Sequence, residues 1–444
     1  MRAPSLSHNA LAAAKPSVAH RGLLAPRRAM SYTLVHVVAG ETTKDLIIPQ
    51  VVGHMVEQAQ TIGTDRPARV MVLFLEPARV ALRPAVRRRV RELKRSAPAL
   101  AVRLVPYVSR LGLTRSAALV RWLVPSLRRG SVVFHCRGET AVQWAAAIAT
   151  PMSDVGIVAD IRGAWPEELV FARGYDGLDA ADARTHADYD KAMSVLREAF
   201  DRAGAVLSVS PGMMEWLGSI GVAETRRFYI PCCVARLTYS AEERAAARTA
   251  LGISDRCVFA YLGTITRYQH VEDGVVPFFR ALSNVAPSAH LLCLTTDVPA
   301  MRAALERGGV HAARATVVCV PQHDVARYLS AADAGLLLRA PTRLNRLSQP
   351  TKLGEYLAAG VPVVVSRGTG VVGEIVTQAN AGAIVDVFGR DASKVAEEAR
   401  RVLDLIARSG PELRASALRL CDEQFLWSRY IARARAAYRL ALAA

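Results

Sequence analysis

Short runs of Val, Ile and Leu, each bounded by Gly or Pro, recur along the chain and alternate with segments of helical pattern. Strands that are buried on both faces of a parallel sheet are apolar at nearly every position, and these runs have that character. A charged helical segment, residues 241–252, separates them into two series. The first series comprises 33–40, 69–77, 101–108, 131–138, 155–163 and 203–210, and the second comprises 257–263, 290–296, 315–321, 334–339, 361–366 and 382–387. The pattern predicts an α/β protein with two doubly wound domains.

The length of the chain agrees with this division, because 444 residues exceed what one hydrophobic core usually supports. We expect an N-terminal Rossmann-like domain over residues 31–235, a C-terminal one over 245–412, and helices over 413–444 that pack back on the domains. Residues 1–30 contain no acidic side chain and are expected to be a disordered leader, or the chain starts at Met30. Parallel sheets bind ligands at the carboxyl ends of their strands, so two facing domains predict a cleft between them.

The composition excludes several classes of protein. Apolar residues make up 51% of the chain, yet no stretch approaches the roughly 18 to 20 uninterrupted apolar residues that span a bilayer. The seven cysteines show neither Cys-x-x-Cys pairing nor a companion histidine spacing, so they predict no disulfide framework and no zinc site. The sequence predicts a cytoplasmic protein.

The net charge of +18 indicates an anionic partner. Arginines concentrate in residues 79–95, where Pro84 can open a basic helix. Such a helix could lie on an anionic membrane surface at the inner face of the membrane, or it could be an ordinary solvated helix; both interpretations stay open. No aromatic residues interleave these arginines and no nucleic-acid motif is present, so RNA or DNA binding is not expected.

The most specific segment is residues 348–365, SQPTKLGEYLAAGVPVVV. It predicts a helix from about Thr351 to Ala359 that stops at Gly360 and leads into a buried strand. Lys352 and Glu355 lie one turn apart on this otherwise apolar helix. A partly solvated helix acid is the simple explanation of Glu355 when it is taken alone.

This segment resembles the donor-binding helix of the family 4 glycosyltransferases of GT-B fold, whose pattern is Glu, seven residues, Glu, then Ala-x-Gly-x-Pro-Val-Val. The resemblance implies that Glu355 holds the ribose hydroxyls of a nucleotide. The first glutamate of the pattern falls at Leu347, a departure shared by a branch that reads Ser-x-Pro-x-Lys-x-x-Glu-Tyr-Leu-Ala-x-Gly. The resemblance extends over nearly all of residues 31–440. It implies a GT-B fold, with two facing Rossmann-like domains and a C-terminal helical segment.

The resemblance also implies the donor side of the site. Gly263 matches the turn below the donor diphosphate, where many members carry Arg directly after the glycine and Lys five residues later; here Thr264 and Gln269 stand at those places. Cations stabilise the charge of a departing diphosphate. Arg267 and Lys352 are therefore the predicted diphosphate ligands.

Two glycine-containing loops are weaker candidates. Gly368, Thr369 and Gly370 form a predicted turn that opens a helix, where backbone amides suit a phosphate or sugar hydroxyls, although a plain loop is equally consistent. Gly40 follows the first strand and matches a small-residue loop that lets the backbone approach donor and acceptor. Asp333, at the end of a helix, is predicted to be structural.

The acceptor side is predicted in the first domain. Asp160, Arg162 and Glu168 resemble the Asp-x-Arg-Gly-x-Trp-x-x-Glu segment of the same branch, and they follow an apolar strand. An internal ion pair of Arg162 with one of these acids is the alternative explanation. His135 and Arg137 lie at the end of another strand and are expected to point toward the same cleft.

The resemblance implies a retaining, metal-independent transfer by front-side attack, with Asp160, Arg162, Arg267 and Lys352 as the catalytic group and no cofactor. The donor is a nucleotide-diphosphate sugar, and the predicted acceptor is a glycan or a polyprenyl-diphosphate-linked saccharide of a surface polysaccharide pathway.

Two other interpretations stay open. The first is another GT-B activity, such as a nucleotide-sugar epimerase. The second is a non-catalytic nucleotide-sugar-binding protein. It is motivated by Leu347 and by Ala235, which stands where the branch usually has Asp after Cys-Cys-Val.

Overall fold

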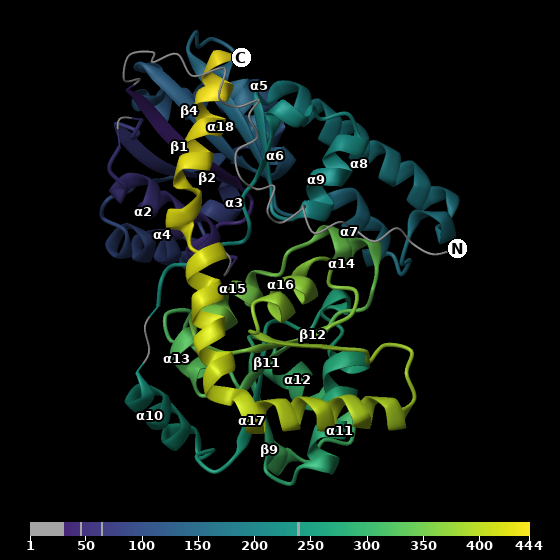
Figure 1. Ribbon diagram of the computed structural model, residues 1–444. Helices are drawn as coiled ribbons and strands as arrows, with labels where there is room; N and C mark the ends of the chain where they lie inside the picture. Colours follow the sequence, from purple (N-terminus) through teal and green to yellow (C-terminus); the bar gives the residue numbers. More distant parts are fainter. Residues whose placement is uncertain (1–30, 45–46, 64, 238–239) are drawn as a thin grey trace.

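The computed structural model describes residues 31–44, 47–63, 65–237 and 240–444, so the predicted leader, with Met30, lies outside the described residues. Two parallel sheets, each with helices on its faces, form two domains that lie one above the other in the view of Figure 1. No helix among the described residues is both long enough and apolar enough to cross a membrane.

The first domain has a seven-stranded parallel sheet in the order β3-β2-β1-β4-β5-β6-β7. Its strands are β1 (Tyr32–Ala39), β2 (Arg69–Pro77), β3 (Ala101–Tyr107), β4 (Ser131–Arg137), β5 (Val155–Ile161), β6 (Ala205–Ser208) and β7 (Arg227–Tyr229). Its helices are α2 (Gly53–Gln60), α3 (Ala78–Ala81), α4 (Pro84–Ser96), α5 (Gly112–Leu123), α6 (Gly138–Ala149), α7 (Trp165–Ala172), α8 (Ala183–Arg202) and α9 (Pro211–Ser219). The strand order reverses between β1 and β4, where doubly wound sheets bind ligands.

The second domain has a six-stranded parallel sheet in the order β10-β9-β8-β11-β12-β13. Its strands are β8 (Cys257–Leu262), β9 (Ala289–Leu294), β10 (Ala315–Val318), β11 (Ala334–Leu337), β12 (Val363–Ser366) and β13 (Gly382–Val385). Its helices are α10 (Ala241–Leu251), α11 (Val276–Val285), α12 (Val298–Arg307), α13 (Val325–Ser330), α14 (Arg343–Leu347), α15 (Thr351–Ala358) and α16 (Val372–Gln378). The order reverses between β8 and β11.

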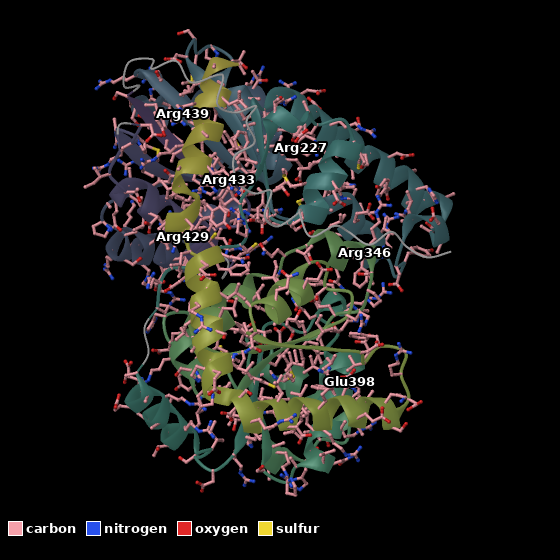
Figure 2. All side chains as sticks on the ribbon, in the orientation of Figure 1. Arg227, Arg346, Glu398, Arg429, Arg433 and Arg439 are labelled. Carbon is pink, nitrogen blue, oxygen red and sulfur yellow. The ribbon has the colours of Figure 1, made fainter. Side chains whose placement is uncertain are left out.

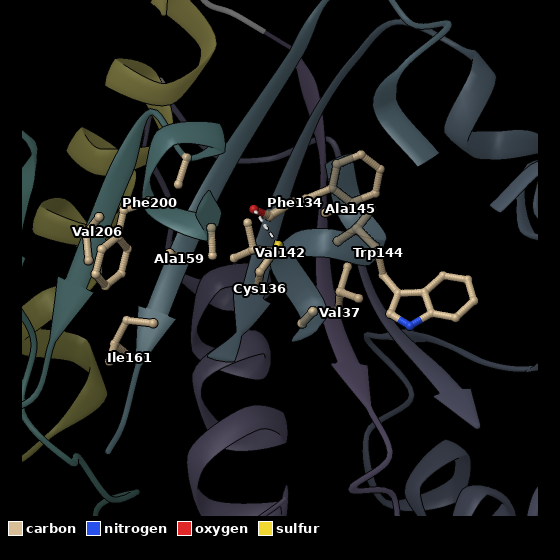
Figure 3. Close-up of a cluster of buried hydrophobic side chains, with 14 of the residues drawn as sticks. Val37, Phe134, Cys136, Val142, Trp144, Ala145, Ala159, Ile161, Phe200 and Val206 are labelled. Carbon is tan, nitrogen blue, oxygen red and sulfur yellow. Dashed lines mark hydrogen bonds between the residues drawn. The ribbon is translucent and has the colours of Figure 1, made fainter. Parts of the chain in front are cut away.

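Each sheet is covered on both faces, which explains the apolar runs of the sequence. In β4, the consecutive residues Val133 and Phe134 are both fully buried but belong to different core clusters, one on each face of the sheet. Figure 3 shows the cluster around Phe134, where Val142 and Trp144 of α6 pack on the sheet. A strand of this kind has no polar face, so apolar and polar residues do not alternate along its sequence.

The C-terminal helices connect the two domains. Helix α17 (Ala392–Gln424) packs on α11 and α15 of the second domain, and its backbone departs from helical geometry at Ser409, two residues before Pro411. The predicted boundary at residue 412 therefore falls inside α17, close to its kink. The chain then crosses to the first domain, where α18 (Ile431–Ala443) packs on β4 to β7. Figure 1 shows the C-terminal helices running from the second domain onto the first.

Arginines hold α18 in place. Arg433 donates from Nη1 to the Tyr229 carbonyl at 2.9 Å, and Arg439 forms an ion pair with Asp65. Figure 2 shows both arginines along this C-terminal segment, with Arg429 before them. The helix therefore binds the first domain by polar contacts as well as by its buried apolar side chains.

The backbone of α18 also lies very close to the sheet. A Cβ on Gly204 would lie 2.7 Å from the Cα of Ala441, and one on Gly156 would lie 2.9 Å from the Ala441 carbonyl carbon. Real Cβ atoms do not approach backbone atoms this closely, so these two glycines permit the docking of the helix.

We therefore predict that Gly204→Ala lowers the free energy of unfolding by about 1–3 kcal/mol, because the added methyl group forces α18 away from the sheet. Gly177→Ala is the matched control: its backbone is extended (φ −165°), and a Cβ there would meet no atom within 4 Å. Urea denaturation of both variants checks this. Equal stability of the two variants would contradict the predicted docking.

Candidate functional site

A cavity of about 1270 Å³ lies between the domains and is lined by both of them. The last residues of five strands reach it: Ala39, Arg137, Ile161, Leu262 and Leu294. The carboxyl ends of the two sheets therefore face one cavity, as the two strand series predict.

Helix α15 supplies a charged pair to the second-domain wall. Lys352 and Glu355 both line the cavity, and each contacts a glutamine. The Lys352 Nζ donates to the Gln269 Oε1 at 2.6 Å, and the Gln322 Nε2 donates to the Glu355 Oε1 at 3.4 Å. Gln269 stands where many members of the resembling family have Lys, and here it binds a lysine that comes from another helix.

The charges on this wall are only partly compensated. Burial raises the pKa of Glu355 to about 7, although the neighbouring Lys352 opposes the shift. Burial, with a further contribution from the Arg339 guanidinium, holds the pKa of Lys352 well below its usual value. A bound anion would reverse the shift of Lys352, because negative charge favours the ammonium form.

Arg339, which follows β11, is the principal residue of this wall that the sequence analysis missed. It is 6% exposed, and it donates to the Gln269 Oε1 at 3.4 Å and to the Ser348 Oγ at 3.3 Å. Its Nε has no hydrogen-bond partner among the described residues. The feature of the sequence that could have identified Arg339 is that it is a single arginine at the end of an otherwise apolar strand.

Gly263 lines the cavity as predicted and has a clear structural reason to be glycine. Its φ is +138°, and a Cβ there would lie 2.3 Å from the Nζ of Lys352. The missing side chain leaves the space that the lysine head group occupies.

Arg267, a predicted diphosphate ligand, contacts the first domain from the second. The side chain borders the cavity, but its Nη1 donates to the Phe171 carbonyl at 2.7 Å and its Nη2 lies 3.3 Å from Asp176. Its guanidinium also lies 4.4 Å from the centre of the Phe171 ring. Arg267 therefore joins the two domains, and the buried cation beside Lys352 is Arg339.

The predicted turn of Gly368, Thr369 and Gly370 does not line the cavity. A Cβ on Gly368 would lie 2.5 Å from the Pro341 Cα, and one on Gly370 would lie 3.0 Å from the Arg346 carbonyl oxygen. The hydroxyl of the buried Thr369 donates to the Ser366 carbonyl at 3.0 Å. The segment that contains α14 covers this turn, so its glycines serve packing.

Leu347, which replaces the first glutamate of the family pattern, packs against the first domain. It is buried in that domain's core cluster, and its carbonyl accepts a hydrogen bond from the Ser210 Oγ at 2.5 Å. Asn345, two residues earlier, lines the cavity, and its Oδ1 has no hydrogen-bond partner in the described part of the chain. Asn345 therefore offers a polar group close to Leu347 that can accept a hydrogen bond from a ligand.

Arg162 is the central cation of the first-domain wall. Its Nε lies 2.8 Å from the Asp160 Oδ1, its Nη1 donates to the Gln50 Oε1 at 3.1 Å, and its guanidinium lies 5.5 Å from the centre of the Trp427 ring. Asp160 is 1% exposed and lies outside the cavity lining. The prediction of Asp160 as a catalytic residue is therefore corrected, since it can act only by positioning Arg162.

His135 is also misplaced by the sequence analysis. It is fully buried behind the cavity, with its Nε2 3.0 Å from Asp160 and its Nδ1 2.9 Å from the Tyr438 hydroxyl of α18. With His36 and His54 it forms the one group of three potential metal ligands found among the described residues, whose nitrogens lie within 4.8 Å of one another. None of the three histidines lines the cavity.

The other predicted residues of the first wall, Arg137 and Glu168, do line the cavity. The Arg137 Nε donates to the Glu41 Oε2 at 2.8 Å. Burial raises the pKa of Glu168, and the nearby Glu139 adds to the shift. A Cβ on Gly163 would lie 2.0 Å from the Glu168 Oε1, so this glycine leaves room for the carboxylate.

Gly40 itself lies outside the cavity lining, between Ala39 and Glu41, which belong to it. Its φ of +76° requires glycine at the turn. Asp333 accepts hydrogen bonds from the backbone of Val258 at 2.7 Å and from Arg244 at 2.6 Å, which confirms its structural role.

Comparison with known proteins agrees with this architecture. Residues 257–405 match the model of the family described as glycosyl transferases group 1, so the match lies in the second domain. No curated protein matches the chain.

Several solved structures share the whole fold. HepE of Anabaena, solved with UDP, is 12% identical, with a TM-score of 0.65 over 92% of this chain and 100% of that chain. Sucrose-phosphate synthase of Thermosynechococcus elongatus is 15% identical, with a TM-score of 0.65 over 93% and 99% of the two chains. WaaG, a glycosyltransferase of lipopolysaccharide biosynthesis, is 15% identical, with a TM-score of 0.55 over 90% and 98%. The chain has the GT-B fold, with two facing Rossmann-like domains and C-terminal helices.

The buried carboxyl of Glu355 predicts a pH dependence of stability. Its pKa in the folded protein is about 7, above the 4.5 of an ordinary glutamate. Below pH 4.5 both states bind the proton; between pH 4.5 and 7 only the folded state keeps it, so this group destabilises the fold increasingly until about pH 7. We predict that Glu355→Gln stabilises the protein by at most about 3 kcal/mol at pH 8 and by almost nothing at pH 4.5.

Urea denaturation at both pH values measures this difference. Glu412→Gln, at an exposed position of α17, is the control and should show no pH-dependent gain. A gain for Glu355→Gln that is the same at both pH values would contradict the raised pKa.

Proposed function

We propose that the protein is a retaining glycosyltransferase that moves a sugar from a nucleotide-sugar donor onto a saccharide acceptor within this cavity. The observation that carries the proposal is the grouping of Arg339, Lys352 and Glu355 on one wall. Two buried cations would bind the diphosphate, and the carboxylate one turn further along α15 would accept hydrogen bonds from the ribose hydroxyls. The match to glycosyl transferases group 1 spans all three residues, and HepE, of the same fold, has been solved with UDP and with UDP-glucose.

The volume of the cavity favours a reaction of two substrates. At about 1270 Å³ it exceeds the roughly 300–1000 Å³ of typical small-molecule sites. A nucleotide sugar on the second-domain wall leaves room for an acceptor against Arg137, Arg162 and Glu168 of the first. An epimerase, which acts on the nucleotide sugar alone, or a simple binding protein has no need of that second polar wall.

In the proposed mechanism the acceptor hydroxyl attacks the anomeric carbon from the face that the diphosphate leaves. The bond from the anomeric carbon to the phosphate oxygen breaks, the bond to the acceptor oxygen forms on the same face, and the acceptor proton passes to the departing phosphate oxygen. Arg339 and Lys352 neutralise the charge that develops on the leaving group, so the mechanism requires no metal ion. The Asn345 Oδ1, which no described donor contacts, would accept a hydrogen bond from the transferred sugar.

We further propose that the acceptor is a glycan or a lipid-linked saccharide of a surface polysaccharide, bound by a protein that sits at the cytoplasmic face of a membrane. The basic helix predicted after Pro84 is α4, and most of its arginines are exposed. Leu82, two residues before this helix, is exposed as well, at 59%. Exposed arginines beside an exposed leucine suit the interface of an anionic membrane.

Substitution of the buried cation tests the donor site. We predict that Arg339→Gln weakens binding of a nucleoside diphosphate by about 10- to 100-fold, because it removes charge-assisted hydrogen bonds in a buried site. Arg267→Gln should weaken it less, since that guanidinium is engaged by Phe171 and Asp176. Titration calorimetry with UDP and GDP measures both effects, and a thermal melt shows that each variant is folded.

Arg346→Gln is the control for this experiment, because that side chain is exposed on α14 and lies outside the cavity lining (Figure 2). The affinity of the Arg346→Gln variant for UDP and GDP should equal that of the unmodified protein. A larger loss for Arg267→Gln than for Arg339→Gln would show that the diphosphate binds elsewhere in the cavity.

A further inference from the structure

Arginines that have buried, unused N–H groups concentrate at the cavity. Six arginines among the described residues keep a buried N–H group that no protein atom accepts, and four of them line the cavity: Arg89, Arg137, Arg162 and Arg339. A buried donor without a partner costs free energy, and a charged one costs more. An uncompensated group of this kind is ready for an anionic ligand.

The four arginines divide between the two walls. Arg339 belongs to the second domain and lies beside Lys352, where the proposed donor diphosphate binds. Arg89, Arg137 and Arg162 belong to the first domain, on α4, at the end of β4 and directly after β5. Because the proposed donor diphosphate binds to the second wall, the three arginines of the first domain are available to bind another ligand.

We propose that Arg89, Arg137 and Arg162 bind a phosphate group of the acceptor, so that the acceptor is a phosphorylated saccharide. This inference rests on the proposed function, because it assigns the donor to the opposite wall. Guanidinium groups bind phosphate with two parallel hydrogen bonds, and three of them on one wall provide several donors.

The local acids do not satisfy this group. Glu41 accepts from the Nε of Arg137, whose Nη1 has no partner within the described ranges of the chain. Asp160 contacts the Nε of Arg162, and the Arg162 Nη2 likewise has no partner in those ranges. Each acid thus fixes one edge of a guanidinium and leaves the other edge to donate to a ligand.

The same wall contains groups that suit the saccharide part of such an acceptor. Glu139 and Glu168 line the cavity, and burial raises the pKa of both. Carboxyl groups accept hydrogen bonds from sugar hydroxyls, and a protonated carboxyl also donates. The wall therefore offers arginines to a phosphate and carboxyls to a sugar.

Helix α4 provides a matched pair of arginines for the test. Arg89 lines the cavity, and no described residue is a partner of its Nε or Nη2, whereas its neighbour Arg88 is exposed and lies outside the lining. Arg89→Gln and Arg88→Gln remove the same charge from the same helix, so they separate a phosphate subsite from the general basic field of the protein.

The experiment is a calorimetric titration of inorganic phosphate into protein saturated with UDP, so that the donor site is filled. We expect one phosphate site in the unmodified protein, affinity lowered at least tenfold in Arg89→Gln, and affinity within twofold of the unmodified value in Arg88→Gln. No binding of phosphate to the UDP-saturated protein would overturn the inference, as would equal losses in the two variants. Failure of the unmodified protein to bind any nucleoside diphosphate would instead overturn the proposed function.

Two further titrations identify the source of the phosphate. Glucose 6-phosphate represents a soluble sugar phosphate, and neutral phosphatidylcholine vesicles that carry a long-chain prenyl phosphate represent a lipid-linked one, with plain vesicles as the blank. Binding of either probe that is lost in Arg89→Gln and kept in Arg88→Gln supports the subsite and assigns its source. Binding of neither probe, or binding that both variants weaken alike, contradicts it.

Discussion

The site depends on two cations held together in a buried environment by one neutral side chain. The Gln269 Oε1 accepts from both Lys352 and Arg339, and the missing side chain of Gly263 leaves the space in which the lysine lies. Without a counter-ion such a pair is unfavourable, and burial lowers the pKa of each of the two groups. Under the proposed function, the stability that the protein loses in assembling this pair would become affinity for a diphosphate, and Glu355, one turn away, would receive the attached ribose.

The first-domain wall depends on a hydrogen-bonded chain that begins at the end of the polypeptide. The Tyr438 hydroxyl of α18 contacts His135, His135 contacts Asp160, and Asp160 holds Arg162 at the cavity. Because α17 packs on the second domain and α18 on the first, the C-terminal helices connect both walls of the site. Docking of α18 is therefore a requirement of the cavity as well as of the fold.

The sequence predicts the sheets and helix α15 because their patterns are local. Apolar runs specify buried parallel strands, although β7, with three residues, is too short to show one. Lys352 and Glu355 are found because one helix contains both. Arg339, by contrast, acquires its role from contacts with Gln269 and Ser348, which no local pattern reveals.

The contacts of other predicted residues could not be read from the sequence for the same reason, since their environments come from distant segments. His135 is covered by Tyr438, and Arg267 reaches Phe171 across the domain boundary.

The most direct test of the account is turnover of a panel of nucleotide sugars, in the presence of a chelator, followed by NMR of the first product formed. We predict release of nucleoside diphosphate from at least one donor, a sugar product with the anomeric configuration of that donor, and loss of this turnover in Arg339→Gln but not in Arg346→Gln. Three results would contradict the account: a product with inverted anomeric configuration, turnover that Arg339→Gln leaves unchanged, and failure of the protein to bind or turn over any donor of the panel.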